Sequence, residues 1–368
     1  MKISRVVLYH LRMPLVSPFE TSFGSIISRD CILLEVHGEG LMGYGECVAD
    51  RDPGYSYETS GTAWHIFKDF LIPAILNQDF HHADELQECL SPVRGHPMAK
   101  AGLELAFWDL LGKQQDRSLR ALLGGITERV EVGVSVGIQD SPKTLLSVVE
   151  GFLKQGYRRV KIKIKPGRDI QETQAVRQAY PELRLQVDAN SAYTLSDSKH
   201  LKPLDDLDLL LIEQPLAEDD LWDHRCMQKQ FNTPICLDES ILSVRHARQA
   251  LEMEACRVIN IKAGRVGGLS QAVAIHNLCH SRDIPVWCGG MLETGVGRAA
   301  NLALASLPGF ILPGDISASN RYYREDITVE RFILNSDSTI TVPNAPGLGV
   351  EIDPESVARY TLQYLDIF

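Results

Sequence analysis

Four apolar runs in the middle of the chain decide its fold. They are RVKIKIK (159–165), LRLQVDAN (183–190), LDLLLIEQP (207–215) and PICLDES (234–240). Each is rich in branched apolar residues and carries polar or charged residues toward its end, and helical stretches such as DIQETQAVRQAYP (169–181) lie between them. Short buried strands that alternate with helices are typical of a parallel sheet in an α/β protein.

The same alternation extends on both sides of these runs. Further strands are expected at VEVGVSVGI (130–138), RVINIKAG (257–264), IPVWCGG (284–290) and GFILPGD (309–315). Eight strands that alternate with helices favour a parallel (β/α) barrel, with a doubly wound open sheet as the alternative. The barrel is preferred because polar residues end almost every strand, and barrel enzymes place their chemistry at that end.

The chain before the barrel has a different pattern. The first 60 residues alternate apolar and polar positions. This alternation predicts antiparallel strands joined by turns at Pro14–Pro18 and His37–Gly40. From about Thr62 to Lys113 the apolar period becomes helical, as in AKAGLELAFWDLLGKQ. The Gly pair at the end of QDRSLRALLGG predicts a domain boundary near residue 125.

The last 50 residues predict short strands over ITVERFILNSDSTITVP, then a Gly-rich stretch and a terminal helix, all packing back on the N-terminal region. We therefore expect an α+β capping domain at 1–125, a barrel at 126–318 and a C-terminal segment at 319–368 that returns to the cap.

Composition narrows the classes of function. The chain has 368 residues and a formal net charge of −11, which argues against a nucleic-acid binder or an anionic-membrane binder. No apolar run approaches the ~18 residues that span a bilayer. Charged residues near the start replace the apolar stretch of a signal peptide, so a cytoplasmic protein is expected. The eight cysteines show no Cys-x-x-Cys spacing, and buried thiols are the preferred interpretation.

Three carboxylates end successive strands. Asp188, Glu213 and Asp238 are each 25 residues apart, one βα unit, which in a barrel places them on adjacent strands at one height. Converging carboxylates repel one another unless a cation lies among them, and hard oxygen ligands suit Mg²⁺. The alternative is that each acid caps the following helix. The regular spacing of all three favours the metal. Polar residues beside them could support the ligands: Asn190, Gln214 and Glu239.

Lysines flank this set on both sides. Lys161 and Lys163 are two residues apart and point to the same side of their strand, and Lys262 ends the strand after that of Asp238. A lysine that acts as a base must be neutral near pH 7, and a neighbouring ammonium and a divalent cation both lower its pKa. The alternative is a set of structural ion pairs, which for Lys161 alone is equally favoured. For Lys163 and Lys262 together catalysis is favoured.

These residues lie in a longer series of motifs. It comprises PFETSFG, GYGECV, KIKIKPG, QVDANSAYTL, LLLIEQPL, PICLDES, NIKAGRVGG, PVWCGGMLETGVGRAAN and LPGDISAS. In this order they resemble the enolase superfamily, in its muconate-lactonizing subgroup, and more narrowly the o-succinylbenzoate synthase / N-succinylamino acid racemase group. The resemblance covers essentially the whole chain.

The resemblance implies a fold and a site. The fold is a (β/α)₇β barrel under an α+β cap that the C-terminal tail completes. Asp188, Glu213 and Asp238 correspond to the metal ligands, for Mg²⁺ with Mn²⁺ as a possible substitute, and Lys163 and Lys262 to the acid/base pair. The reaction begins with removal of a proton alpha to a carboxylate, and Mg²⁺ stabilises the resulting anion.

The implied activity is Mg²⁺-dependent syn-dehydration of 2-succinyl-6-hydroxy-2,4-cyclohexadiene-1-carboxylate in menaquinone biosynthesis, with N-succinylamino acid racemisation beside it. Racemisation as the main role is the first alternative. Dipeptide epimerases usually carry an acidic motif after the last strand, whereas DISASN has Asp315 as its only acid. A non-catalytic barrel that binds small carboxylates is disfavoured by the intact lysine pair and acid triad. A homo-oligomer is expected, as in the family.

Substrate contacts are expected from several loops. The N-terminal loops that cover the substrate in the family carry aromatic and hydroxyl residues. The glycines before the last helix of the barrel could present free N–H groups to a carboxylate. Arg265 matches an arginine of racemase-capable members, with a structural role at the start of a loop as the alternative. The predicted contact residues are Phe19, Ser22, Phe23, Tyr55, Ser135, Arg265, Gly290, Met291, Leu292 and Tyr322.

Overall fold

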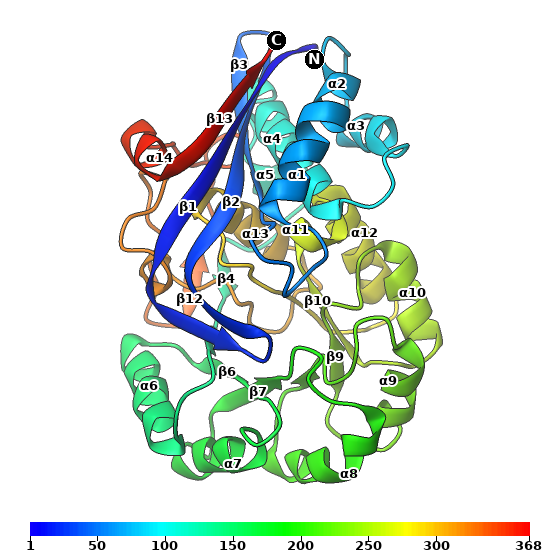
Figure 1. Ribbon diagram of the computed structural model, residues 1–368, viewed down its shortest axis with the longest axis vertical. Coiled ribbons are helices and arrows are strands. Elements are labelled where there is room, and N and C mark those ends of the chain that lie inside the picture. Colours follow the sequence, from blue (N-terminus) through cyan, green and yellow to red (C-terminus); the bar gives the residue numbers. More distant parts are fainter.

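An antiparallel sheet at one end of the molecule and a curled parallel sheet at the other make up the computed structural model, which describes residues 1–368 (Figure 1). The strands are β1 (Ile3–Thr21), β2 (Gly24–Gly38), β3 (Leu41–Cys47), β4 (Arg129–Glu131), β5 (Val134–Val136), β6 (Arg159–Lys163), β7 (Arg184–Asp188), β8 (Ile212–Glu213), β9 (Ile235–Leu237), β10 (Val258–Ile261), β11 (Val286–Cys288), β12 (Thr339–Thr341) and β13 (Thr361–Ile367).

The helices cover one face of the first sheet and surround the second. They are α1 (Ser60–Ile66), α2 (Ile72–Ile75), α3 (Ala83–Leu90), α4 (Pro97–Gln114), α5 (Leu119–Leu123), α6 (Pro142–Gln155), α7 (Ile170–Ala179), α8 (Ser198–Leu201), α9 (Leu221–Gln228), α10 (Val244–Glu252), α11 (Ala263–Val266), α12 (Leu269–His280), α13 (Gly295–Ala305) and α14 (Pro354–Tyr360). One π turn joins α1 to α2, and short 3₁₀ turns lie at 195–197, 202–207 and 319–321. None of the helices has both the length and the apolar character that crossing a membrane requires.

The first sheet has the strand order β13-β1-β2-β3, with every pair antiparallel. Helix α4 lies directly on it because Gly43 and Gly45 of β3 have no side chain. A Cβ on either glycine would lie within 2.2 Å of a backbone oxygen of α4. The expected antiparallel N-terminal strands are therefore confirmed, and glycines set how closely the long helix packs on them.

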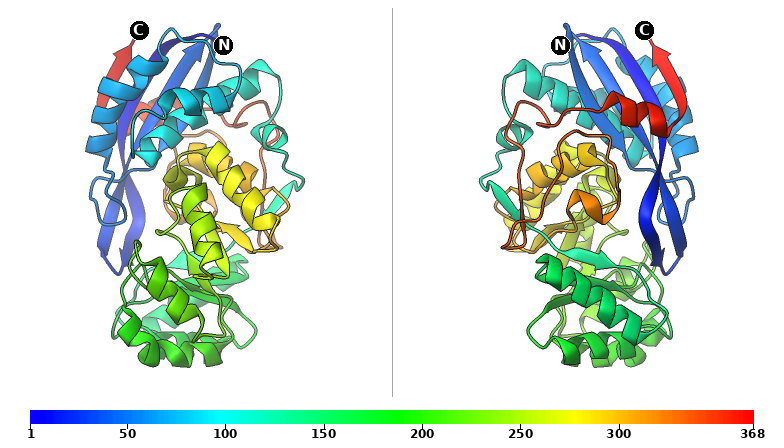
Figure 2. Two further views of the ribbon diagram at one scale, coloured as in Figure 1. Left: turned by 90° about the vertical axis from the view of Figure 1, so that its right-hand side faces the viewer. Right: turned by 90° about the vertical axis from the view of Figure 1, so that its left-hand side faces the viewer.

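The turn predicted at Pro14–Pro18 is wrong. Strand β1 continues to Thr21, and its pairing with β2 only shifts register between Pro14 and Phe19. Proline cannot donate to a ladder, and here it interrupts the pairing without reversing the chain. The Val16 N–H instead donates to the carbonyl of Tyr322, 2.9 Å away. The β1–β2 hairpin therefore extends beyond the first sheet and reaches down beside the barrel (Figure 2).

The second sheet is parallel, with the order β11-β10-β9-β8-β7-β6-β5. The segment at 309–315 closes it: Gly133 N donates to Gly314 O over 2.8 Å, and Asp315 N donates to Cys288 O over 2.9 Å. The barrel prediction is confirmed, but its eighth strand is irregular. Pro313 lies inside it and has no N–H for a regular ladder.

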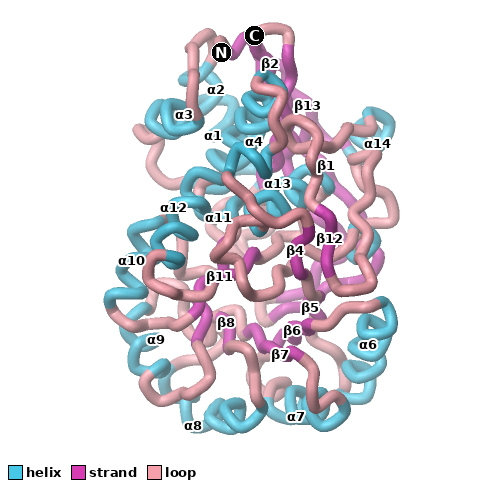
Figure 3. Tube along the Cα trace, turned by 180° about the vertical axis from the view of Figure 1, so that it is seen from behind, coloured by secondary structure: helices cyan, strands magenta, loops and turns pink.

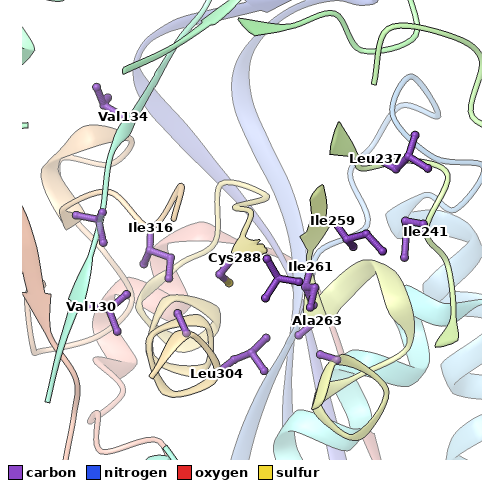
Figure 4. Close-up of a cluster of buried hydrophobic side chains, with 14 of the residues drawn as sticks. Val130, Val134, Leu237, Ile241, Ile259, Ile261, Ala263, Cys288, Leu304 and Ile316 are labelled. Carbon is purple, nitrogen blue, oxygen red and sulfur yellow. The ribbon is translucent and has the colours of Figure 1, made fainter. Parts of the chain in front are cut away.

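Helices α6 to α10 and α12 lie outside the parallel strands (Figure 3). Their apolar sides and the strands share one large hydrophobic core. Figure 4 shows part of it, where Leu237 and Ile259 of the neighbouring strands β9 and β10 lie toward Ile241, and Ile261 lies beside Ala263. The core packs against the outer side of the strands and leaves their carboxyl ends available for polar side chains.

The C-terminal region returns to both sheets. Of the strands predicted over 327–343 only β12 forms, paired antiparallel with β4. The expected terminal helix is present as α14, but it is not terminal: β13 follows it and pairs antiparallel with β1, from Val6 with Ile367 to Leu11 with Thr361. Figure 2 shows β13 beside β1. All eight cysteines are free, six of them buried.

Candidate active site

The carboxyl ends of β6 to β10 form one rim of polar side chains. Because these five strands are neighbours in the sheet, Lys163, Asp188, Glu213, Asp238 and Lys262 follow one another around it. Lys163 lies opposite Asp188 in the β6–β7 register, and Asp188 lies opposite Glu213 in the β7–β8 register. The rim thus runs from one lysine through three acids to a second lysine.

Lys161 lies deeper than Lys163 on the same strand and faces three carboxylates. Its Nζ is 2.6 Å from Asp315 Oδ2, 2.8 Å from Glu213 Oε2 and 3.0 Å from Asp188 Oδ2. Its side chain is 3% exposed. Burial lowers the pKa of Lys161, but the three carboxylates outweigh burial and raise it well above its ordinary value. The three carboxylates therefore favour the ammonium form of Lys161 in this arrangement.

Lys163 and Lys262 lie on opposite sides of the acids. Lys163 Nζ donates to Asp188 Oδ2 and to Asn190 Oδ1, each over 2.6 Å. Lys262 Nζ donates to Asp238 Oδ2 over 2.7 Å and to the Tyr55 hydroxyl over 3.0 Å. The strand order places the two ammonium groups four strands apart, facing each other across the rim.

The environment shifts the pKa of several rim groups. Burial raises the pKa of Asp188, but Lys163 and Lys161 outweigh burial and hold it well below its usual range. Burial and the charge of Asp188 raise the pKa of Glu213 to about 7. Burial lowers the pKa of Lys262, but the Tyr55 oxygen and the Glu213 and Glu239 carboxylates raise it above its ordinary value. A lysine base needs the opposite shift, which an added positive charge among the carboxylates produces.

A further layer of polar side chains orients the acids. Asn260 Nδ2 donates to Glu213 Oε1 over 2.8 Å, and Asn190 Nδ2 donates to Glu239 Oε1 over 2.8 Å. Gln214 Oε1 accepts the Asp238 N–H over 2.9 Å. Asn190, Gln214 and Glu239 thus lie beside the candidate ligands.

The residues fit a hard divalent cation through their donor chemistry. No three Asp, Glu, His or Cys side chains are spaced as a metal cluster, because the carboxylates turn toward ammonium groups and the Arg265 guanidinium. Carboxylate oxygens from three adjacent strands nevertheless form an all-oxygen donor set. Glu239 Oε2 is buried without a hydrogen-bond partner beside it. Unpartnered buried carboxylate oxygen at an acid-rich rim fits a cation site.

A pocket open to solvent lies above the rim between the barrel and the N-terminal sheet. Eight of the ten predicted substrate contacts line it, together with the three lysines and Asn190: Phe19, Phe23, Tyr55, Ser135, Gly290, Met291, Leu292 and Tyr322. The hairpin of β1 and β2 and the loop after β3 supply its aromatic side, and the loop after β11 supplies its opposite side.

Two predicted contacts do not line the pocket. Ser22 donates its hydroxyl to the carbonyl of Asn190 over 3.0 Å, so it ties the hairpin to the barrel. Arg265 is 1% exposed and lies behind the pocket, where it pairs with Asp238 and donates to the carbonyl of Asn260 over 2.8 Å. Its Nη1 also donates to the Tyr55 hydroxyl over 3.2 Å. Both side chains are used within the protein in this structure, and their direct contact with substrate stays a prediction.

Several site residues have no motif that isolates them in the sequence. Arg29, Asp50 and Glu58 line the pocket, and each comes from a stretch that resembles ordinary strand or loop. Asp315 differs, since its position in DISASN marked it, but its pairing with Lys161 and with Arg159 over 2.6 Å depends on barrel closure.

Comparisons with known proteins identify the family of the chain. Residues 3–124 match the model of the N-terminal domain of the mandelate racemase / muconate lactonizing enzyme family, and residues 145–356 match that of the enolase C-terminal domain-like family. The chain is 50% identical to an o-succinylbenzoate synthase of Geobacillus kaustophilus, over 100% of this chain and 97% of that protein.

Two further proteins show the range of the likeness. An N-succinylamino acid racemase of Thermus thermophilus is 49% identical over 98% of both chains. The crystal structure of an enolase superfamily member from Listeria innocua superposes with a TM-score of 0.96 at 45% identity, over 100% of this chain and 99% of that one.

Proposed function

The chain belongs to the enolase superfamily, in the group of o-succinylbenzoate synthases and N-succinylamino acid racemases, and from that membership we propose that it is an o-succinylbenzoate synthase. The reaction is the syn-dehydration of 2-succinyl-6-hydroxy-2,4-cyclohexadiene-1-carboxylate, which makes the protein a lyase. We place this reaction in menaquinone biosynthesis.

One observation carries the proposal. Lys163 and Lys262 face each other across three carboxylates at the base of a pocket lined by apolar and aromatic side chains. This arrangement suits a reaction that removes a proton next to a carboxylate and stabilises the anion that forms.

Each lysine has its own task in the proposal. Lys163 takes the proton alpha to the substrate carboxylate and then delivers a proton to the departing hydroxyl on the same face. Lys262, on the other side, supplies positive charge to the anion. Lys161 remains an ammonium, since Asp315 and Glu213 hold it, and it faces the substrate carboxylate as a fixed charge.

Divalent-metal dependence is general among these relatives, and we propose Mg²⁺, with Mn²⁺ as a substitute. Asp188, Glu213 and Asp238 would hold it, with Asn190 and Glu239 beside them. A bound divalent cation supplies electrostatic stabilisation to the negative charge that develops on the substrate carboxylate. The lysines perform every proton transfer.

The pocket fits a small carboxylate with an apolar ring and a succinyl arm. Phe19 and Tyr322 form an edge-to-face pair at 6.2 Å in its wall. Ser135 Oγ is buried there without a hydrogen-bond partner in the protein. A buried hydroxyl that lines a pocket unpaired fits a polar substrate group.

Racemisation of N-succinylamino acids is the second candidate. The two lysines approach from opposite sides, and racemisation needs proton transfer on both sides, whereas dehydration needs proton transfer only by Lys163. The same first step, proton removal alpha to a carboxylate, serves both reactions. A relative named for each activity is about equally similar to this chain.

The test is a paired assay of the purified protein with Mg²⁺. We expect o-succinylbenzoate to form from the cyclohexadiene substrate, and an N-succinylamino acid to racemise, with both activities lost in Lys163→Arg. Absence of both reactions in the metal-loaded wild type contradicts the proposal. If the protein racemises N-succinylamino acids but does not catalyse the dehydration, its main role is that of the second candidate, an N-succinylamino acid racemase.

The remaining assignments are also proposals. We propose a cytoplasmic homo-oligomer that acts on a small-molecule carboxylate. We also propose the division into a cap at 1–125, a barrel at 126–318 and a C-terminal segment at 319–368. The pairing of β13 with β1 supports the return of that segment to the cap.

A further inference from the structure

One wall of the pocket is held in a conformation that its own sequence does not favour. Met291 and Leu292, in the loop between β11 and α13, both line the pocket. Leu292 has a φ of 58°, in the left-handed region. Leucine adopts this region only when surrounding contacts compensate for the strain.

Two side chains from other parts of the chain donate hydrogen bonds to carbonyl groups of this loop. The Tyr323 hydroxyl donates to the carbonyl of Leu292 over 2.5 Å. Arg29 Nε donates to the carbonyl of Met291 over 3.2 Å. Within the loop, the Met291 N–H donates to Glu293 Oε2 over 2.8 Å. The carbonyl groups of both wall residues therefore accept hydrogen bonds from side chains that lie outside the loop.

The two donor residues are themselves fixed. Arg29, on β2, is 3% exposed, donates to the carbonyl of Val48 and lies 3.0 Å from Asp50 Oδ2. Tyr323 is 3% exposed and follows the 3₁₀ turn of the C-terminal segment. Tyr323 does not itself line the pocket, and its hydroxyl reaches the pocket wall through the carbonyl of Leu292.

We propose that Tyr323 and Arg29 are positioning residues that hold the Met291–Leu292 wall in its left-handed turn and so set the shape of the substrate pocket. The cap and the C-terminal segment thereby determine how the barrel loop fits the substrate. The effect on turnover rests on the proposed function, whereas the effect on the loop does not.

Loss of one of these hydrogen bonds has a defined consequence. Without the Tyr323 hydroxyl the Leu292 carbonyl loses its partner, and the strained turn relaxes toward a conformation that leucine prefers. The lysines and carboxylates lie on other strands and keep their contacts. Substrate fit should therefore weaken while proton transfer continues, which separates KM from kcat.

The first variant is Tyr323→Phe, which deletes only the hydroxyl. We expect KM for the cyclohexadiene substrate to rise about tenfold, the change that one hydrogen bond corresponds to, with kcat within about twofold of wild type. In the ligand-free protein, amide hydrogen exchange of the 290–294 segment should become several-fold faster.

The matched control is Tyr193→Phe, which also deletes a buried tyrosine hydroxyl, one that donates to Asp169 Oδ2 over 2.9 Å. It should leave KM and exchange at 290–294 unchanged. Arg29→Lys is the second variant and serves if Tyr323→Phe does not fold; it should raise both KM and the exchange rate at the same segment. The double variant should show less than the summed effect, because both residues act on one loop.

Unchanged exchange at 290–294 in Tyr323→Phe and in Arg29→Lys would overturn the proposal, as would an equal KM change in Tyr193→Phe. If the wild type does not turn over the substrate, the exchange measurement still decides the loop, and the failure belongs to the proposed function alone.

Discussion

The Tyr55 hydroxyl donates a hydrogen bond to Asp238 Oδ1 over 3.1 Å, which ties the loop after β3 to the rim of the barrel. The same oxygen accepts a hydrogen bond from Lys262 over 3.0 Å. A single side chain of the N-terminal region therefore touches both a candidate metal ligand and a candidate acid/base lysine, so the seating of the cap influences the chemistry of the barrel.

Tyr55→Phe removes this contact with little change in volume. We expect kcat/KM to fall about tenfold to a hundredfold, because the lost hydrogen bonds involve charged groups. Steady-state kinetics measures the effect, and thermal unfolding should show a similar Tm. Tyr9→Phe is the control, since Tyr9 donates to Glu35 on the first sheet, away from the pocket. Wild-type kinetics in Tyr55→Phe would contradict a role at the rim.

Replacement of each lysine separates the two faces of the site. In Lys262→Arg, arginine is a poor base because its pKa stays above ~12. With N-succinylamino acids in D₂O, the enantiomer whose proton faces Lys163 should still exchange slowly, and the other should not. Lys163→Arg should show the mirror result and also lose dehydration. Proton NMR of the alpha position measures both.

The wild type provides the control for this experiment, since it should exchange both enantiomers and interconvert them. Exchange of both enantiomers at wild-type rates in either single variant would mean that the lysines do not divide the two faces as the strand order suggests.

Removal of the metal should abolish activity. The proposed ligands are carboxylates with no competing neutral donor, so EDTA should remove the cation, and Mg²⁺ or Mn²⁺ should restore turnover. Asp238→Asn should bind Mg²⁺ more weakly by calorimetry and retain the fold. Full activity of the protein after EDTA treatment would contradict the metal proposal.

The free energy of unfolding should carry a pH dependence from Glu46. Glu46, on β3, accepts hydrogen bonds from Thr294 and Gly297 at the start of α13, and burial raises its pKa from 4.5 to about 7. Below pH 4.5 the group is protonated in both states. As pH rises to about 7 only the unfolded chain loses the proton, so stability falls across this window.

Glu46→Gln removes this titration. The wild-type free energy of unfolding, relative to that of the variant, should decrease by ~3 kcal/mol between the two ends of the window, because one pKa unit corresponds to about 1.4 kcal/mol. Urea unfolding at a series of pH values measures the difference. The readout is the slope with pH, since the amide also alters the hydrogen bonds at every pH. Parallel curves for the two proteins would show that the pKa of Glu46 is the same in the folded and unfolded chain, which contradicts the prediction.

The sequence by itself determined the architecture and the order of the rim. Branched apolar runs followed by helices specify a parallel sheet, and a constant spacing of 25 residues puts Asp188, Glu213 and Asp238 on adjacent strands. Both follow from local periodicity, because each βα unit repeats one pattern and successive parallel strands become neighbours. Lys163 and Lys262 take their places from the same repeat.

Only the tertiary structure decided which other segments of the chain pack around that rim and which contacts they make. The path of β1 through Pro14, the strand β13 that follows α14, and the irregular eighth strand depend on partners hundreds of residues away. The pairing of Arg265 with Asp238 and the hydrogen bond from Tyr323 to Leu292 join residues that are closer in sequence, but these contacts too depend on how separate elements pack. Such contacts have no period in the sequence, because they arise where separate segments pack and satisfy one another's buried polar groups.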